Sequence, residues 1–544
     1  MRNSYIGQSI DNITAERKVT GKALFPGDFI FPNQAFLQVV FAQKVHAIIK
    51  KIDISSAEKY PGVITVITAK DVPCNEYGLI IPDQPVLCGS GSSKPFADRV
   101  RFIGDQVALV IADSREIAKE ASKLIKIEYE ELPVITDVQQ AMQKDSFLIH
   151  PEKKSNIFCK YQINKGDIKK AFDKADIVIE EDYHTPSQEH VFLQPEAGIG
   201  YIDEEGRVTV IVAGQWAHED QRQIAHALKL PKEKVRVIYP AIGGAFGGRE
   251  DMSVQIILAL AAFKLNQMGI NRPIKTVWSR AESFIGHHKR HPYDIHAKWG
   301  ANNEGKLIAA EMQLYADGGA YAYTSTKVLG NATLLVTGPY DIPNVKINSY
   351  VVYTNNIPNG AFRGFGGPQA CYVAEMQMNK LAEALGMDPV EIRMRNLIRE
   401  NVPTSVGTPL PKGISIKNVI EKCAKSSGWK ITDKIWKYPI NIKSNDKETT
   451  KCRGIGFSAG YKNVGFSFGA PEECWATIEL FGKKEIEKAI LHHAGADVGQ
   501  GSHTIFKQIA ASALNISIEK IKLIVSDTAY ADDSGSASAS RMTF

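Results

Sequence analysis

Apolar and polar positions alternate in short blocks along the first part of the chain. Branched and aromatic residues cluster into strand patterns at 35–41, 63–68 and 102–112. Apolar positions at helical spacing follow between 115 and 125, and a further strand pattern (KIEYEEL) comes after them. We therefore predict a small α/β domain over residues 1–142, with the polar segment 143–156 as a linker.

A larger region, residues 157–430, repeats the succession of strand, loop and helix. Its predicted elements are strands at 208–213 and 235–240, helices at 217–229, 251–265 and 368–385, and a hairpin over 295–315. The hairpin is expected to turn at Asn302–Gly305, and Gly386 is expected to cap the last helix. We find no repeat of fixed period here.

The remaining part of the chain begins with a basic and polar segment, 431–453, which we predict to be a second linker. After it, residues 454–544 carry a hairpin pattern and then a helical pattern (HTIFKQIAASAL). The whole succession predicts an α+β fold, with a small N-terminal α/β domain followed by a large mixed α/β region.

Composition narrows the class of protein. The 544 residues correspond to about three to four domains, and the apolar (44%) and charged (23%) fractions are those of folded proteins, not of disordered or collagen-like ones. A net charge of +5 is too small for a chain of this length to indicate nucleic-acid binding. The longest apolar run, 256–263, is too short to span a bilayer, and the N-terminus lacks a hydrophobic leader. We expect a soluble cytoplasmic protein.

The seven cysteines argue against a metal cluster within this chain. The closest pair, Cys74 and Cys88, is far apart for a ligand pair, and no C-x-x-C motif occurs. An odd count favours reduced thiols, with buried structural cysteines as the default expectation. Iron–sulfur clusters and zinc ribbons are therefore not expected here.

Three glycine-rich loops could carry chemistry. The first, Gly243–Gly248 (GGAFGG), lies between a predicted strand and helix, where backbone N–H groups can approach a ligand, although it fits neither a P-loop nor a dinucleotide motif. The second, Asn359–Gln369, places an arginine between two phenylalanines. The third, Gly495–His503, carries Gln500 between two glycines, and its amide can donate and accept.

Each loop also has a simpler interpretation. A structural turn at a helix entry would explain the glycines, and Glu250 and Asp251 would suit a helix N-terminus electrostatically. The segment GHHKRH contains His287, His288 and His291, which could suggest metal ligands. Because no fourth ligand is spaced nearby, we interpret this segment as a solvated basic loop.

Taken in order, the three loops resemble those of the molybdopterin-binding subunit of the xanthine dehydrogenase (molybdenum hydroxylase) family. Three further segments match: VTGKALFPGD near the N-terminus, SQEHVFLQPEAG at Ser187–Gly198, and DSGSASASR at Asp533–Arg541. The resemblance covers essentially the whole chain. It implies a hammerhead-like N-terminal domain, a first molybdopterin-binding domain over 157–430, and the start of a second over 454–544.

The resemblance also implies roles for individual residues. Gln215 would hydrogen-bond the pterin, and Phe246 and Gly247 would lie against the molybdenum centre. Arg363, Gln500 and the backbone of Ala539 would complete the cofactor site, so that Gln215, Phe246, Arg363 and Ala539 hold the metal through molybdopterin. Glu250 would orient a purine-like substrate, with Phe365 stacking on it and Phe466 or Phe468 supplying the other face.

Two departures from the family pattern matter. Asn331 stands where the family has a purine-binding arginine, and an amide lacks the charged fork of that residue. The catalytic glutamate of the family lies beyond the last motif present here, so we expect the general base to be on a second polypeptide or lost by truncation. Carbon monoxide dehydrogenases carry a cysteine after the loop arginine, where this chain has Gly364.

The resemblance implies hydroxylation of an electron-poor carbon with oxygen from water, in a heteromeric complex. The cofactor would be molybdopterin or its cytosine dinucleotide form, with iron–sulfur clusters and FAD on partner subunits. A purine or related N-heterocycle is the expected substrate. The alternatives are an aldehyde oxidoreductase subunit, or a non-catalytic fragment that binds partners or cofactor.

Overall fold

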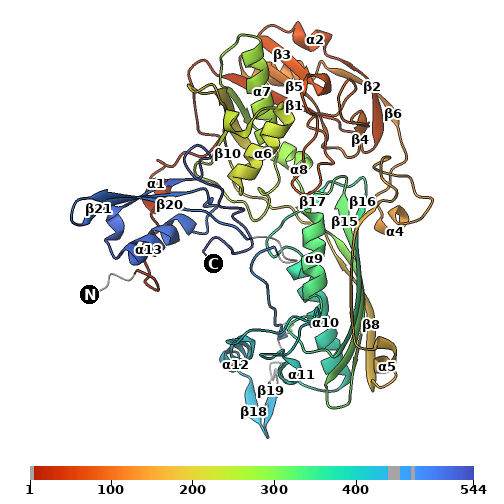
Figure 1. Ribbon diagram of the computed structural model, residues 1–544. Coiled ribbons are helices and arrows are strands. Elements are labelled where there is room, and N and C mark those ends of the chain that lie inside the picture. Colours follow the sequence, from red (N-terminus) through yellow and green to blue (C-terminus); the bar gives the residue numbers. More distant parts are fainter. Residues whose placement is uncertain (1–4, 439–453, 467–471, 544) are drawn as a thin grey trace, which may run out of the picture.

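A computed structural model describes residues 5–438, 454–466 and 472–543. Figure 1 shows three lobes in this part of the chain: one built by the N-terminal strands together with α6 and α7, one by a long sheet under α9 and α10, and one around α13. Each lobe has its own buried apolar cluster, and the candidate site lies where loops from all three meet.

A seven-stranded mixed sheet forms the first lobe. Its order is β11 (Val235–Ile238), β10 (Val208–Val212), β9 (Ala197–Ile202), β12 (Ile274–Val277), β1 (Ala35–Phe41), β5 (Gln106–Ala112) and β3 (Val63–Thr68). The parallel pair β1–β12, which aligns Ala35 with Ile274, joins its two halves. Strands from the predicted N-terminal domain and from the following region therefore share one sheet and one core.

Helices α6 (Ala217–Leu228) and α7 (Gln255–Gln267) pack on this sheet. Helix α7 is apolar on nearly every side, with Ile256, Leu258 and Leu260 all fully or almost fully buried, which explains its uniform composition. The predicted strands at 35–41 and 63–68 are present with those bounds. The predicted helix at 251–265 instead begins at Gln255.

The second lobe is a five-stranded sheet in the order β7 (Ile157–Lys165), β16 (Asn344–Tyr353), β15 (Leu307–Gly319), β14 (Tyr293–Ala301) and β8 (Ile177–Thr185). Helices α9 (Ser325–Leu335) and α10 (Gly367–Ala384) pack against it, followed by α11 (Pro389–Asn396) and α12 (Ile416–Ser426). The predicted hairpin is β14–β15, and Gly386 follows α10 in a left-handed conformation.

The third lobe joins β20 (Thr477–Gly482), β21 (Ile486–His493) and β22 (Ile521–Val525) with α13 (Ser502–Leu514). The remaining elements are short: α1 (Ala15–Val19), β2 (Ala47–Asp53), α2 (Ser55–Glu58), β4 (Arg99–Val100), α3 (Arg115–Ser122), β6 (Lys126–Glu131), α4 (Val138–Ala141), α5 (Ile168–Phe172), α8 (Arg280–Gly286), β13 (Lys289–Arg290), β17 (Asn359–Gly360), β18 (Lys430–Thr432) and β19 (Ile435–Lys437), with 3-10 turns at Ala69–Asp71, Lys232–Lys234 and Ile518–Lys520.

Both predicted linkers contain ordered structure. In the first, Ile149 and His150 are buried, so that segment packs against the protein instead of crossing solvent. The second opens with the hairpin β18–β19, and its remaining residues, 439–453, lie outside the described part of the chain. Among the described helices, none is both long and apolar enough to cross a bilayer.

Candidate functional site

The first two glycine loops lie directly against each other. The backbone N–H of Arg363 donates to the carbonyl of Phe246 over 2.7 Å. Gly247 has φ +98°, and a Cβ there would sit 2.9 Å from the carbonyl oxygen of Ala361. Only glycine combines this left-handed backbone with so close an approach. The pair of loops is therefore a fixed unit and not two independent helix entries.

Gln215 connects the first loop to the Ser/Ala motif near the end of the sequence. Its side-chain Nε2 donates to the carbonyl of Ala537 (3.1 Å), and its Oε1 accepts from the backbone N–H of Arg249 (3.2 Å). The backbone of Gln215 repeats the same pairing, because its N–H donates to the carbonyl of Arg249 and its carbonyl accepts from the N–H of Ala537. Gln215 thus contacts Ala537, which lies 322 residues further along the sequence, and fixes it beside the first loop.

Glu250 lies buried beside the same junction, with 3% of its surface exposed. Its Oε2 has no hydrogen-bond partner within the described residues. Burial raises the pKa of Glu250 to about 7, against a smaller opposing effect of the Ser538 hydroxyl. The simpler interpretation, a carboxylate at a helix N-terminus, is wrong because α7 begins only at Gln255. A buried carboxyl that titrates near neutrality can both donate and accept.

The aromatic residues and Ala539 meet at the segment that contains Gly465 and Phe466. The rings of Phe365 and Phe466 lie edge to face, with centroids 6.1 Å apart and an interplanar angle of 82°. The N–H of Gly465 donates to the carbonyl of Ala539 over 3.0 Å. Phe468 lies outside the described residues. The two described rings therefore form a corner and not two parallel faces.

Three of these predicted site residues have strained backbones. Phe246, Phe365 and Ala539 have φ values of 56°, 50° and 50°, which side chains with a Cβ rarely adopt. Such conformations cost about 1–3 kcal/mol each and concentrate at ligand sites. Their coincidence with the predicted positions supports a binding role for this junction.

A buried residue of the third glycine loop packs in the same apolar cluster as residues of the junction. Ala496 is buried in one apolar cluster with Ala213 and Ala537. Gln500 itself is exposed, and its amide is held by its own loop: Oε1 accepts from the N–H of Val498 (2.7 Å) and Nε2 donates to the carbonyl of Ala496 (3.0 Å). The loop is thus preformed, with Gln500 at its surface.

Asn331 and Arg363 differ sharply in exposure. Asn331 is completely buried on α9, next to Ala332, against which the left-handed Gly366 of the second loop packs. The Arg363 side chain is exposed, and its guanidinium makes no hydrogen bond to any described residue. Arg363 is therefore the charged group that this junction leaves available to an anionic ligand.

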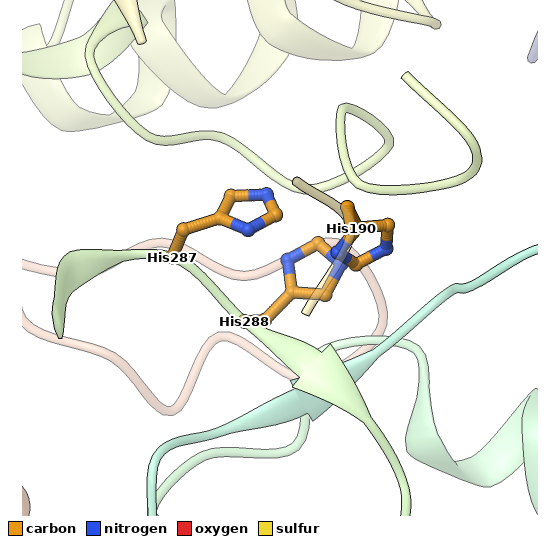
Figure 2. A group of neighbouring side chains, drawn as sticks. All are labelled: His190, His287 and His288. Atoms are coloured by element: carbon orange, nitrogen blue, oxygen red, sulfur yellow. The ribbon is translucent and has the colours of Figure 1, made fainter. Parts of the chain in front are cut away.

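The interpretation of the GHHKRH segment as a solvated loop is wrong. His287, His288 and His291 are 3%, 2% and 1% exposed. The segment includes β13, whose two residues pair in parallel with β17 at the start of the second glycine loop. Figure 2 shows the rings of His287 and His288 turned towards His190, which comes from the SQEHVF segment.

These three imidazoles hold the carbonyls of both loops. Nε2 of His190 and of His288 both lie within hydrogen-bond distance of the Ala361 carbonyl, at 2.8 and 3.2 Å, and Nε2 of His287 lies 2.5 Å from the carbonyl of Gly248. A carbonyl only accepts, so each Nε2 carries the proton. We call His190, His287 and His288 the histidine bracket.

Burial favours the neutral form of two of these imidazoles. It lowers the pKa of His190 to about 2 and that of His288 well below its usual range, and the neighbouring His287 adds to both shifts. Arg290 supports the same loop, because its guanidinium lies 3.9 Å from the Phe362 ring centroid and donates to the carbonyl of Arg363 over 3.0 Å. The sequence offered one signal for these roles, the run of basic residues between a helix and a strand.

The junction fits a large polar cofactor. It offers glycine-lined backbone, a Glu250 oxygen with no hydrogen-bond partner among the described residues, an exposed Arg363 guanidinium and strained residues at the surface of the loops. Similarity to known families identifies that cofactor as molybdopterin. Residues 149–397 and 422–544 match the molybdopterin cofactor-binding domain families, and residues 20–133 match the hammerhead domain of aldehyde oxidase and xanthine dehydrogenase.

Comparison with the sequences of whole proteins identifies the same family. The chain is 38% identical to the nicotinate dehydrogenase large molybdopterin subunit of Eubacterium barkeri, over 78% of this chain and 96% of that protein. It is 34% identical to a probable xanthine dehydrogenase subunit of Bacillus subtilis, over 97% of this chain and 67% of that protein. The chain belongs to the xanthine dehydrogenase and aldehyde oxidase family of molybdenum hydroxylases.

Solved structures share the fold. The aldehyde oxidoreductase of Desulfovibrio gigas superimposes with a TM-score of 0.88 at 28% identity, over 99% of this chain and 58% of that one. The carbon monoxide dehydrogenase of Oligotropha carboxidovorans superimposes with a TM-score of 0.84 at 25% identity, over 97% of this chain and 68% of that one. The chain spans just over a third, 36%, of the xanthine dehydrogenase/oxidase of Gallus gallus, to which it is 31% identical.

Proposed function

We propose that this chain is the molybdopterin-binding catalytic subunit of a multi-subunit hydroxylase that oxidises a purine or a related N-heterocycle. The observation that carries the proposal is Glu250, a buried carboxyl with a pKa of about 7 and one unpartnered oxygen at the loop junction. Ring nitrogens of a heterocycle offer both donors and acceptors, and a carboxyl whose pKa is raised by burial can match either, as the acid or as the carboxylate. The relative named nicotinate dehydrogenase, whose name specifies a nitrogen heterocycle, supports this substrate class.

One set of the predicted site residues would bind the cofactor, and a second set would bind the substrate. Gln215, Phe246, Gly247, Arg363, Gln500 and Ala539 would hold the cofactor, which when bound supplies the oxidation of the substrate carbon. Glu250 orients the ring by hydrogen bonds, and the corner of Phe365 and Phe466 supplies apolar contact that excludes water. Hydrogen bonds that strengthen as charge moves onto the ring lower the barrier more than they tighten binding.

The complex would need further chains. We propose that iron–sulfur clusters and FAD are on partner subunits, since among the described cysteines no closely spaced set suited to a cluster occurs. The pterin would be molybdopterin or its cytosine dinucleotide form. The name "large molybdopterin subunit" of the Eubacterium relative supports assembly with further subunits.

An aldehyde oxidoreductase is the second candidate. Asn331, buried on α9, supplies no charge where the family has a purine-binding arginine, and the Desulfovibrio neighbour is an aldehyde oxidoreductase. An aldehyde substrate has no ring nitrogens, so its binding would require neither the charge of that arginine nor a hydrogen bond to Glu250. The third possibility, a non-catalytic fragment, would bind cofactor or partners without turnover.

Steady-state kinetics on the complete complex tests these functions. A purine, nicotinate and an aldehyde are compared as substrates for the parent, for Glu250→Gln and for the exposed control Glu233→Gln. We expect turnover of a heterocycle, a loss in Glu250→Gln of about 2–4 kcal/mol of transition-state stabilisation seen in kcat, and no change in the control. Heterocycle turnover by Glu250→Gln at the parent rate would contradict the role of Glu250.

The substrate panel also separates the alternatives. If the parent complex oxidises only the aldehyde, the second candidate is correct. If it oxidises none of the three while its molybdenum content is full, the fragment hypothesis gains over both.

A further inference from the structure

A second cluster of chemically active side chains contains no residue of the three glycine loops. Cys74 and Glu76 follow the 3-10 turn Ala69–Asp71 in the first lobe, and His226 lies in the last turn of α6. The Cys74 Sγ is 3.4 Å from Nε2 of His226, and Oε1 of Glu76 is 3.2 Å from the same nitrogen. All three ligand atoms lie within 4.8 Å of one another.

These distances are those of a tetrahedral zinc site. With Zn–S about 2.3 Å, Zn–N about 2.05 Å and Zn–O about 2.0 Å, a tetrahedral angle places sulfur about 3.6 Å from nitrogen, and nitrogen about 3.3 Å from oxygen. The observed separations of 3.4 and 3.2 Å agree with both edges. A thiolate, an imidazole and a carboxylate together favour Zn²⁺ or a similar borderline cation over Mg²⁺ or Ca²⁺.

The backbone around the cluster is fixed in advance. Asn75, completely buried between the two ligands, pairs with Leu87 in both directions: Nδ2 donates to the Leu87 carbonyl over 2.8 Å, and Oδ1 accepts from its N–H over 3.0 Å. The N–H of Cys74 donates to the carbonyl of Ala227 over 2.9 Å, which ties the loop to α6 beside His226. The ligands therefore need little reorganisation to bind a metal.

Lys94 orients the third ligand. Its ammonium lies 3.4 Å from Oε2 of Glu76, which leaves Oε1 directed at His226. A support of this kind for a ligating carboxylate is typical of metal sites. The side chains of Glu76 and His226 remain 35% and 51% exposed, so a water molecule can complete the fourth position.

We propose that Cys74, Glu76 and His226 bind one Zn²⁺-class cation, which connects the N-terminal part of the first lobe to helix α6. The inference is independent of the substrate of the loop junction. The thiolate is the form of cysteine that binds a metal, so binding releases the thiol proton and the affinity should rise with pH.

Cobalt titration of the full chain, stripped of loosely bound metal with a chelator, tests the proposal. Co²⁺ bound to a thiolate gives a near-ultraviolet charge-transfer band and visible bands of tetrahedral coordination. We expect one equivalent of Co²⁺ to produce these bands and one equivalent of Zn²⁺ to remove them. Cys74→Ser should abolish the charge-transfer band, while Glu76→Gln and His226→Gln should weaken Co²⁺ binding at least tenfold.

Two control variants make the test specific. Cys423→Ser replaces an exposed cysteine on α12, and Cys474→Ser replaces the cysteine whose Sγ lies 3.5 Å from Nε2 of His493. Both should keep the parent spectrum and affinity. Zn²⁺ should also raise the melting temperature of the parent and not that of Cys74→Ser. A missing charge-transfer band in the parent, or a band that survives in Cys74→Ser, would overturn the proposal.

Discussion

Replacing Glu250 by glutamine should change how the stability of the protein depends on pH. The folded protein raises the pKa of this carboxyl from 4.5 to about 7 by burial. The folded state therefore binds more protons than the unfolded state between these two values, and its stability falls as the pH rises through that window. Above about pH 7 the ionised carboxylate is buried without a full set of partners among the described residues, and this penalty is complete.

The magnitude follows from the shift. A change of about 2.5 pKa units at about 1.36 kcal/mol per unit gives about 3 kcal/mol, which the parent loses between about pH 4.5 and pH 7. Glutamine has nearly the same shape and never ionises, so it should not show this loss. Glu250→Gln should thus gain about 3 kcal/mol relative to the parent between about pH 4.5 and pH 8.

Paired thermal unfolding of the parent and the variant at several pH values measures this gain. Burial also raises the pKa of the neighbouring Asp251 well above its usual range, with a further contribution from Glu250, so parent and variant are compared at each pH. The exposed Glu233→Gln serves as the matched control and should follow the parent at every pH. A difference between parent and Glu250→Gln that stays constant from about pH 4.5 to pH 8 would show that Glu250 is not desolvated in the folded protein.

Three further predictions concern the cofactor. Gln215→Ala and Arg363→Ala should lower the molybdenum content of the assembled enzyme, because each loss of a polar partner costs about 1–3 kcal/mol or more. Asn331→Ala should leave the molybdenum content nearly unchanged. Equal molybdenum contents in all three variants would refute the assignments. Gly247→Ala should also lower molybdenum content, since its Cβ would lie 2.9 Å from the backbone of Ala361 at a φ of +98°, and an unaltered content would show that the loops can separate. The isolated chain should carry neither iron–sulfur cluster nor flavin, and stoichiometric iron or a flavin absorption spectrum would contradict this.

The sequence predicts individual strands, helices and loops better than it predicts which of them contact one another. Strand 35–41 could be predicted because its branched and aromatic residues favour an extended chain, but no local pattern indicates that Ala35 pairs with Ile274. The sequence pattern places the start of the helix after the first glycine loop four residues too early. The carboxylates of Glu250 and Asp251 resemble a helix start, whereas in the structure both are buried before the helix begins.

The histidine bracket shows the limit of pattern analysis most clearly. A run of histidine, lysine and arginine has the composition of a surface loop, so the sequence predicted solvent exposure. In the structure Nε2 of each of these imidazoles lies within hydrogen-bond distance of a carbonyl of a residue distant in the sequence, Gly248 or Ala361. Burial of polar side chains depends on such partners, and the sequence does not reveal them until the loops are brought together.

The position of β12 in the seven-stranded sheet has a consequence for synthesis on the ribosome. Strands β1, β3 and β5 are complete by residue 112, yet the edge of β1 at Ala35 and Phe36 receives its neighbour only when Ile274 and Lys275 have been made. Through this interval the nascent chain presents an unpaired strand edge with apolar side chains, the kind of surface on which chains aggregate. The emerging polypeptide should therefore be most vulnerable before β12 arrives, and binding by a chaperone in that interval would favour correct folding.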